Sequence, residues 1–358
     1  MHLIPGVGPR IRGLLLGRFG SADAVFQADR ASLMALPGIG AQLADSITDP
    51  RFAELARIER LNCREQNVSL VLAGDPDYSR LLSEIPDPPA VLYRRGTWET
   101  ADALAVALVG SRQCSQYGRR IARRLARGLA TAGITVVSGL ARGIDTQAHE
   151  GTLEAGGRTI AVCATGLASI YPPENADLAA RICESGAMVT ESPLGQKPVR
   201  GLFPQRNRII SGLCHGVVIV DASRKSGALH TARHAMEQGR EVFAVPGQID
   251  SLSCEGCHDL IRDGVTLIRG VEDILDGLGP LIEPAKDRTG REVHTPRELS
   301  LTDQERTILE TVTTEPCTID RVVQMTGLET SRVLTTLTVL EMKRLVRRVP
   351  GGQVVRCS

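Results

Sequence analysis

Residues 103–110, ALAVALVG, form an apolar run that contains no charged side chain and ends in glycine. A run of this length and composition is typical of a β-strand that is buried on both faces of a parallel sheet. Similar runs and helical segments alternate along the next 160 residues or so. The predicted strands are 103–110, 134–139, 158–166, 187–192, 216–222, 241–247 and 265–268, and the helical segments are 117–133, 143–157, 175–186, 205–214 and 227–239. This alternation predicts an α/β domain with a doubly wound, Rossmann-like parallel sheet.

The composition is that of an ordinary soluble protein with more than one domain. The chain has 358 residues, of which 42% are hydrophobic and 23% are charged, so two or three domains are expected. A formal net charge of +1 excludes a globally basic nucleic-acid binder, and a polyanion site would therefore need local clustering of cations. The nine cysteines lack framework spacing, no secretion signal is recognisable, and no apolar run reaches the ~18 residues of a membrane span. We therefore expect a reduced, cytoplasmic protein with no membrane partner.

Two smaller domains are predicted beside this sheet domain. Residues 1–65 contain an internal echo, in which LIPGVG and ALPGIG each precede a helical run. The echo resembles a tandem helix-hairpin-helix (SAM-like) domain, which contacts either DNA phosphates through backbone amides or another protein. Residues 300–358 have the order of a winged-helix domain, and their nearly balanced charges favour protein contact or weak DNA binding. The remaining boundaries place the Rossmann-like domain at 66–281 and a polar linker at 282–299.

The loops that follow the predicted strands are rich in glycine, serine and arginine. In a parallel sheet these loops share one edge, and ligands bind there. Glycine lets a backbone approach an anion, and arginine can form two hydrogen bonds with a phosphate. The predicted anion contacts are Gly110, Ser111 and Arg112 in the first loop, and Ser138, Gly139 and Arg142 in the second.

The segment 192–220 contains no aspartate or glutamate. Its cations are Lys197, Arg200, Arg206 and Arg208. The last two lie in FPQRNRIISGL (203–213), where an early proline and the spacing of the apolar residues predict the first turns of a helix. Because a helix N-terminus is already positive, cations there favour a bound anion. The alternative is that these arginines pair with carboxylates such as Glu191 or Asp221 and tie the loops together.

Three other chemistries have weaker signals. Ser138, Asp145 and His149 are the residue types of a hydrolase triad, but the last two lie on one predicted helix and no nucleophile elbow surrounds the serine. Residues 254–258, CEGCH, match the haem-attachment pattern, yet haem attaches to exported proteins and zinc would need a fourth ligand. GSRQCSQYG (110–118) lacks the dinucleotide-binding fingerprint. We therefore expect no catalytic residue, no metal and no cofactor.

Short motifs in the central part of the chain resemble, in their order, those of one known family. They include VGSR, SGLARGID, IYPPEN, FPQRNRIISGL, SGALHTA, GREVFAVPG and LIRDG. From about residue 70 to 271 the chain is similar to the DNA-processing protein A (DprA/Smf) family, and the two flanking domains fit its three-domain members. The resemblance implies a homodimer that binds and protects single-stranded DNA without sequence preference. It also implies loading of the RecA recombinase on incoming strands during natural transformation, with no catalysis.

The resemblance further implies which residues contact DNA, and it implies a dimer formed through the Rossmann-like domain. Arg112 and the basic segment would hold phosphates, and Phe203 would stack a base. The full predicted DNA-binding set is Gly110, Ser111, Arg112, Ser138, Gly139, Arg142, Lys197, Arg200, Phe203, Arg206, Asn207, Arg208, Ser226 and Gly227. The predicted dimer contact is formed by His258, Leu260, Ile261 and Leu267.

Several positions depart from the patterns of known families. Pro173 and Glu174 stand in the YPPEN loop where family members often have lysine, so that phosphate contact is in question. His230 stands in SGALHTA where a small or apolar residue is usual, which suggests pH sensitivity. The alternative function is a nucleotide hydrolase of the N-glycosidic phosphoribohydrolase type. In that class a glutamate stands where this chain has His234, so the carboxylate for the chemistry is missing.

Overall fold

The computed structural model describes residues 1–281, 285–286 and 290–357. The chain divides into two compact units, Met1–Leu267 and Ile268–Ser358, and each is described by itself. Within the described ranges, no helix combines the length and the apolar character needed to cross a membrane.

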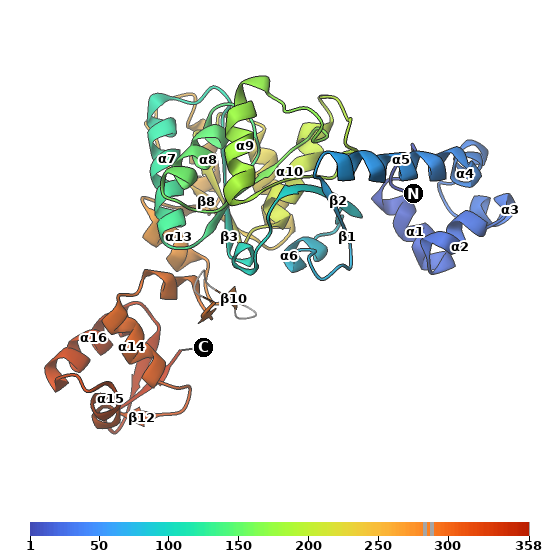
Figure 1. Ribbon diagram of the computed structural model, residues 1–358. Coiled ribbons are helices and arrows are strands. Elements are labelled where there is room, and N and C mark those ends of the chain that lie inside the picture. Colours follow the sequence, from blue (N-terminus) through green and yellow to red (C-terminus); the bar gives the residue numbers. More distant parts are fainter. Residues whose placement is uncertain (282–284, 287–289, 358) are drawn as a thin grey trace. The chain divides into compact units, whose positions relative to one another are not determined.

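A nine-stranded sheet forms the centre of the first unit (Figure 1). Its order is β1-β2-β6-β5-β4-β3-β7-β8-β9, and every neighbouring pair from β6 to β9 is parallel. The strands are β1 (Ser69–Leu72), β2 (Val91–Gly96), β3 (Ala105–Gly110), β4 (Thr135–Ser138), β5 (Thr159–Val162), β6 (Ala187–Thr190), β7 (Gly216–Val220), β8 (Glu241–Ala244) and β9 (Thr266–Leu267). The parallel strands fall within the seven predicted runs, which confirms the predicted Rossmann-like sheet. The antiparallel strands β1 and β2 extend one edge beyond β6.

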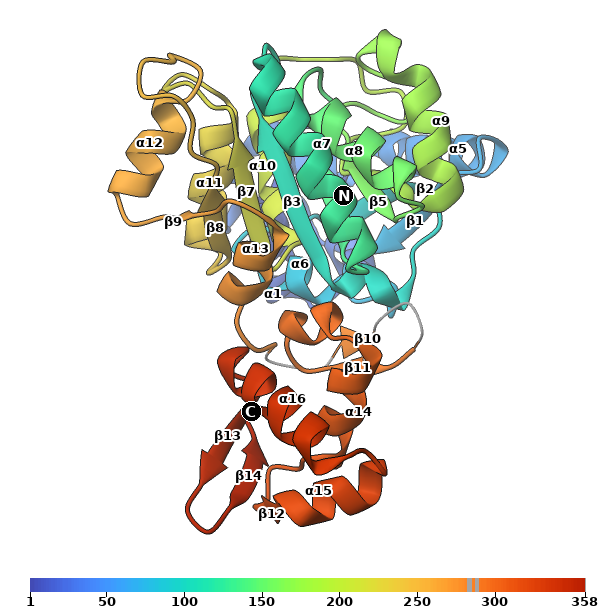
Figure 2. The ribbon, with the colours of Figure 1, turned by 90° about the vertical axis from the view of Figure 1, so that its left-hand side faces the viewer.

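Helices cover both faces of this sheet, with α7, α8 and α9 on one face and α10 and α11 on the other (Figure 2). Along β5 the side chains alternate between the two layers. Ile160 and Val162 join the core beneath α10 and α11, whereas Ala161 joins the core beneath α9. The helices of this layer system are α6 (Arg80–Ser83), α7 (Gln116–Thr131), α8 (Ile144–Glu154), α9 (Ala176–Ser185), α10 (Leu202–Gly212), α11 (Ala228–Glu237) and α12 (Glu255–Arg262), with 3-10 turns η1 (Thr100–Ala103) and η2 (Pro173–Asn175).

The order of the strands reverses between β3 and β7. From β3 the chain runs outward through β4 and β5 to β6, and then crosses back to place β7 on the other side of β3. Loops that leave the carboxyl ends of β3 and β7 therefore diverge to opposite sides. Ligands of doubly wound sheets bind in the crevice at such a switch point.

The N-terminal helices form two equivalent hairpins. Gly6 and Gly38 both have a φ of 87°, a conformation that glycine adopts at little cost, and a helix begins three residues after each of them. The helices are α1 (Pro9–Phe19), α2 (Ala22–Gln27), α3 (Arg30–Met34), α4 (Ala41–Thr48) and α5 (Arg51–Glu65). Their shared apolar core includes Leu15, Leu33 and Ile47. The echo in the sequence thus corresponds to a repeated turn, as the tandem helix-hairpin-helix interpretation predicts.

The second unit contains a three-helix core with a small sheet of order β12-β14-β13. Its elements are α13 (Val271–Gly277), β10 (Ala285–Lys286), β11 (Glu292–Val293), η3 (Pro296–Ser300), α14 (Asp303–Thr311), β12 (Cys317–Thr318), α15 (Ile319–Thr326), α16 (Thr330–Met342), β13 (Val346–Val349) and β14 (Gln353–Arg356). Three helices followed by the β13–β14 hairpin confirm the predicted winged helix. The stretch 282–299, predicted as a polar linker, includes the paired strands β10 and β11 and the turn η3 among its described residues. Strands of two residues are too short to show a sequence period, so they could not be recognised from the sequence.

Candidate nucleic-acid interface

A cleft of about 780 Å³ lies at the switch point of the sheet, beside the end of β3. Loops after β3, β4 and β7, together with the first turns of α10 and α11, form its walls. The predicted residues that line it are Gly110, Ser111, Arg112, Arg142, Arg200, Phe203, Arg206, Asn207, Ser226 and Gly227. Residues from four separate loops and helices thus meet at one hollow, and we refer to it as the cleft.

The loop between β3 and α7 forms one wall of the cleft. A Cβ atom on Gly110 would clash with the carbonyl oxygen of Val220, so the close approach of β3 and β7 here requires glycine. Two residues later, the exposed guanidinium of Arg112 lies over the ring of Phe203, with 5.0 Å between its central carbon and the ring centroid. This cation–π contact holds a positive charge and an aromatic face together at the cleft.

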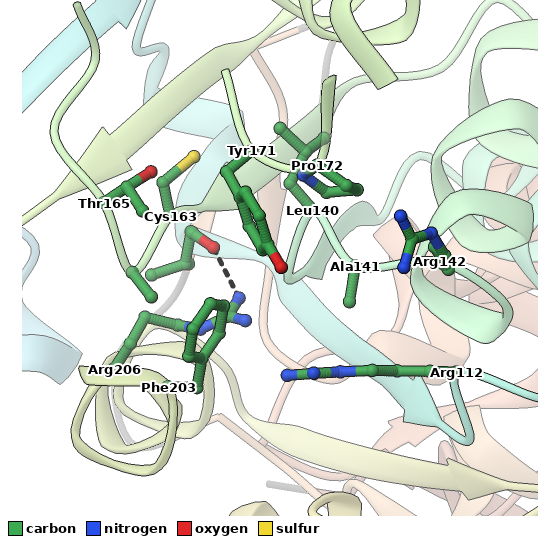
Figure 3. A pocket seen from close by; sticks show the side chains of 12 residues that line it. Arg112, Leu140, Ala141, Arg142, Cys163, Thr165, Tyr171, Pro172, Phe203 and Arg206 are labelled. Atoms are coloured by element: carbon green, nitrogen blue, oxygen red, sulfur yellow. Dashed lines mark hydrogen bonds between the residues drawn. The ribbon is translucent and has the colours of Figure 1, made fainter. Parts of the chain in front are cut away.

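Arg206 forms part of the floor of the cleft, and the residue is only 6% exposed. Its Nη1 donates a hydrogen bond to the Val162 carbonyl oxygen (Figure 3). Burial lowers the pKa of the Arg206 guanidinium, and the nearby Asp145 carboxylate opposes that shift. Burial likewise raises the pKa of Asp145, and Arg206 opposes this. Arg206 was predicted as a surface phosphate contact, but the structure makes it a buried cation that shapes the cleft from below.

Arg208 does not reach the cleft. Residues two apart on a helix point about 200° apart, so Arg206 and Arg208 leave α10 in nearly opposite directions. Arg208 Nε donates to Asp87 Oδ2 at 3.2 Å, and its Nη2 donates to Glu191 Oε2 at 2.6 Å. The alternative interpretation, in which an arginine pairs with Glu191, therefore describes Arg208.

Three further predicted contacts also lie outside the lining of the cleft. Ser138 is fully buried, and its hydroxyl donates to the Leu108 carbonyl oxygen at 2.6 Å. Gly139 has no room for a Cβ atom, which would clash with both Arg206 and Asp145. Lys197 is exposed on the long loop before α10. The first two therefore support the floor of the cleft, whereas the third is exposed outside its lining.

Arg142 lines the cleft, but it is already paired with a carboxylate. Its Nε donates to Glu174 Oε1, and this hydrogen bond lowers the pKa of the Glu174 carboxyl. Both side chains are largely exposed. The unusual glutamate of the YPPEN loop thus neutralises one of the cations that a phosphate would contact.

A narrow side slot of about 30 Å³ opens beside the cleft, and aromatic rings form part of its wall (Figure 3). The rings of Tyr171 and Phe203 are 5.8 Å apart between centroids and are tilted by 58°. Leu140, Pro172 and the buried end of Arg206 complete the slot. At about 30 Å³ the slot has room for little more than a water molecule, so a ligand would have to lie in the larger cleft.

Sequence reasoning missed several residues of the cleft. Lys225 lines it between β7 and α11, although it stands directly beside the predicted Ser226. The signal was present, because DASRKSGAL contains two cations; the other one, Arg224, is paired with Asp259 and Glu255. Other lining residues that were not predicted as contacts include Gln113, Tyr171, His230 and Thr231.

The cleft is strongly electropositive. Its charged lining consists of Arg112, Arg142, Arg200, Arg206 and Lys225 and a single carboxylate, Asp145, and Glu174, outside the lining, pairs with Arg142. The Asp145 carboxylate is buried below the floor and its pKa is raised, so it weakens the positive potential only in part. In a chain with a net charge of +1, this concentration of cations makes the cleft the candidate site for an anion.

The candidate hydrolase groups do not form a catalytic arrangement. His149 is fully buried; its Nε2 donates to the Gly139 carbonyl oxygen at 2.6 Å, and its Nδ1 contacts the Thr159 hydroxyl at 2.7 Å. Both ring nitrogens are thus engaged away from Ser138. His234 is half-buried on α11 and is absent from the lining of the cleft. Among the described residues, no group of three or more histidine, cysteine or acidic side chains could hold a metal ion.

Comparisons with known proteins agree with the resemblance seen in the sequence. The family model for DNA recombination-mediator protein A matches residues 69–279, the DprA winged-helix model matches 292–352, and the SAM-like helix-hairpin-helix tandem model matches 3–49. The Smf protein of Synechocystis is 36% identical over 384 aligned positions, which cover 99% of this chain and 96% of the relative.

Two solved structures are also similar. DprA of Streptococcus pneumoniae is 34% identical with a TM-score of 0.68, and the match covers 76% of this chain and 94% of that one. DprA of Helicobacter pylori, described for its single-stranded DNA binding mode, is 29% identical with a TM-score of 0.53, covering 58% and 93%. Together, the domain order, the cleft and these matches show that the chain belongs to the DNA recombination-mediator protein A (DprA/Smf) family.

Proposed function

We propose that this protein binds single-stranded DNA in the cleft, without sequence preference and without catalysis. In this proposal it acts in the cytoplasm as a recombination mediator that protects DNA taken up during natural transformation and hands it to RecA. The observation that carries the binding function is the excess of cations in the cleft over one buried carboxylate. The family membership and the strand-binding relative from H. pylori support it.

The shape and chemistry of the cleft favour a single strand over a duplex. Phe203 presents a ring next to the cation Arg112, and a free base can stack on such a ring, whereas bases in a duplex are already stacked. Arginine and lysine heads read the phosphate backbone and not the base edges, so sequence preference is not expected. The hydrolase alternative has no carboxylate in the cleft other than Asp145, which lies below the floor.

Replacing Arg112 with alanine should weaken binding of a single-stranded oligonucleotide roughly tenfold, since a hydrogen bond to a charged group contributes about 1.5 kcal/mol or more. The slope of log K against log salt should become shallower by about 0.7, the value for one lost contact with a single strand. Fluorescence anisotropy with a labelled oligonucleotide at several salt concentrations measures both quantities. Arg181→Ala, on the exposed side of α9, is the matched control and should change neither. An unchanged affinity in the Arg112 variant would remove the cleft from the proposal.

A second substitution, beside the cleft, is expected to raise the affinity for DNA and so serves as a control for the first. Glu174→Gln releases Arg142 from its ion pair, so this variant should bind the same oligonucleotide severalfold more tightly and with a steeper salt slope. A loss of affinity in both variants would indicate damage to the fold rather than loss of a phosphate contact.

We also propose a homodimer through the surface around α12 and β9. Leu260 and Ile261, predicted as contacts, are half-buried and pack against the core of the sheet domain. Leu267 on the edge strand β9 is 42% exposed. In the loop between β8 and α12, Ile249 is 92% exposed and Leu252 is 73% exposed. Leu267 is itself a predicted contact, and Ile249 and Leu252 precede α12 in the chain; a second copy of the chain is the occupant we propose for these three exposed apolar side chains. His258 is the fourth predicted contact. Its Nε2 lies 3.4 Å from the backbone nitrogen of Gly247 and 3.1 Å from the carbonyl oxygen of the same residue, so it ties the loop between β8 and α12 to α12.

Replacing Leu252 with glutamate should raise the dissociation constant of the dimer roughly tenfold or more, because a charge would be buried in an apolar interface. Sedimentation velocity over a concentration series measures this constant. Leu55→Glu is the matched control, since Leu55 is 49% exposed on α5 and lies outside the proposed interface. An unaltered dimer in the Leu252 variant would place the interface elsewhere.

A further inference from the structure

The outer face of α7 carries a dense group of cations outside the cleft. The helix contains five arginines and no acidic residue. Its apolar side chains, among them Ile121, Leu125 and Leu129, are buried against the sheet, so the arginines occupy the opposite side. They are Arg119, Arg120, Arg123, Arg124 and Arg127. A helix of 16 residues is about 24 Å long, so this face is a strip rather than a point.

Most of this charge is not balanced within the protein. Arg123 pairs with Glu154 and with Glu150 on α8. In contrast, Arg119, Arg120 and Arg127 form no ion pair with a carboxylate of any described residue. Like charges spaced three or four residues apart destabilise a helix by about 0.2–0.5 kcal/mol per pair, and the positive N-terminus adds to this repulsion. A bound polyanion would relieve that repulsion.

The N-terminal end of α7 adjoins the cleft and presents an aromatic ring. Arg112 and Gln113 line the cleft, and α7 begins only three residues later at Gln116. The Tyr117 hydroxyl donates to the Pro246 carbonyl oxygen at 2.9 Å, which fixes a ring that is 38% exposed. The guanidinium carbon of Arg120 lies 5.9 Å from the centroid of this ring. The pairing of ring and cation repeats the arrangement of Phe203 and Arg112 in the cleft.

We propose that the outer face of α7 is a second binding surface for single-stranded nucleic acid, which holds the part of a strand that has left the cleft. This inference rests on the proposed function, because it assumes that the cleft holds the same strand. Arginines supply phosphate contacts along the strip, and Tyr117 supplies a stacking face where the strand first meets the helix. An exposed ring beside unpaired cations suits nucleic acid better than an acidic peptide, which has no bases to stack.

The test compares a short and a long oligonucleotide on the full-length protein. The short strand has about six nucleotides, within the ~4–16 nucleotides that single-strand-binding folds cover, and the long strand is several times longer. The variant is Arg119→Gln, Arg120→Gln and Arg127→Gln together. The matched control removes three exposed arginines elsewhere: Arg64→Gln, Arg181→Gln and Arg233→Gln on α5, α9 and α11.

The triple variant on α7 should bind the short strand as the wild type does, within about twofold. For the long strand its salt slope should be shallower by about 2, the value for three lost contacts, so the advantage of the wild type should shrink roughly fifteenfold between 50 and 200 mM salt. Replacing the same three residues with lysine should restore the wild-type slope. The melting temperature should not fall, because repulsion along α7 is removed, and the dimer should be unchanged in sedimentation.

Each other outcome has a distinct meaning. If the α7 variant binds the long strand as the wild type does, the inference is overturned while the proposed function stands. An equal loss in the control variant would also overturn it, since any exposed arginine would then suffice. If the wild type binds neither strand, the proposed function itself fails. If a polyglutamate peptide binds the wild type but not the variant, and the long strand is unaffected, the surface belongs to an acidic protein partner instead.

Discussion

Replacing Arg206 with methionine is expected to lower the free energy of unfolding at pH 7 by about 4 kcal/mol, since removal of one member of a buried pair of opposite charges leaves the other uncompensated. Arg206 and Asp145 are both buried, and each is the main electrostatic influence that opposes the shift in the other's pKa. The substitution also leaves the Val162 carbonyl oxygen without its hydrogen bond from the guanidinium. Urea unfolding followed by circular dichroism measures the loss.

The pH dependence of this loss identifies its cause. Without Arg206, the pKa of the buried Asp145 carboxyl should rise further above its unfolded value of 3.8. The folded variant then holds a proton that the unfolded chain releases, so its stability should fall as the pH rises above about 4. The difference from the wild type should accordingly be smallest in acid and grow toward pH 7.

The control is the double variant Arg206→Met, Asp145→Asn. It removes both charges and keeps an oxygen that can accept from the Ala141 backbone N–H, so it should recover most of the lost stability. If the single and double variants are equally unstable at all pH values, the charge on Asp145 is not responsible. The DNA affinity of the double variant then reports how much Arg206 adds to binding from the floor of the cleft.

Lowering the pH from 7 to 4 is expected to remove about 3 kcal/mol of stability through His149 alone. Burial lowers the pKa of His149 to about 4, whereas the unfolded value is 6.5. Its Nε2 donates to the Gly139 carbonyl oxygen and its Nδ1 contacts the Thr159 hydroxyl, so the ring is enclosed by protein groups and a charge on it would have no water to solvate it. A difference of about 2.5 in pKa corresponds to about 3 kcal/mol.

The sign follows from the proton count. Between pH 6.5 and pH 4 the unfolded chain binds a proton at this position and the folded chain does not, so stability is complete above pH 6.5 and falls as the pH drops. Denaturant unfolding of the wild type and of His149→Gln at pH 7 and at pH 4.5 isolates the effect, because other titrating groups are common to both. A wild type that loses no more stability than the variant over this range would contradict a neutral buried His149.

The strands and helices of the fold could be predicted from local patterns in the sequence. The apolar runs that became β3, β7 and β8 are buried along nearly their whole length, and such strands carry the same signal wherever they lie in the sheet. The repeated turns at Gly6 and Gly38 were also visible, because positive φ angles select glycine. The two-residue strands β10 and β11 were not, since a pair so short leaves no period.

The candidate site was predictable only as a set of loops. Glycine-rich loops at the carboxyl ends of strands pointed to the edge of the sheet where the cleft lies, and most of the predicted residues line that cleft. The sequence did not separate Arg206 from Arg208, although one forms the floor and the other pairs with Glu191 on a different side of α10. Nor did the sequence show that Glu174 lies next to Arg142 and pairs with it, because the two residues are 32 positions apart in the chain.

By itself, the sequence determined the architecture, the family and the edge of the sheet at which an anion would bind. Those properties depend on periodicity, turn residues and the order of motifs, all of which are local along the chain. Only the tertiary structure decided which cations remain available to a ligand, and it also revealed the unbalanced arginines on α7. The charge available at a site depends on burial and on carboxylates that lie close in space but far away in the chain, and a linear pattern contains neither.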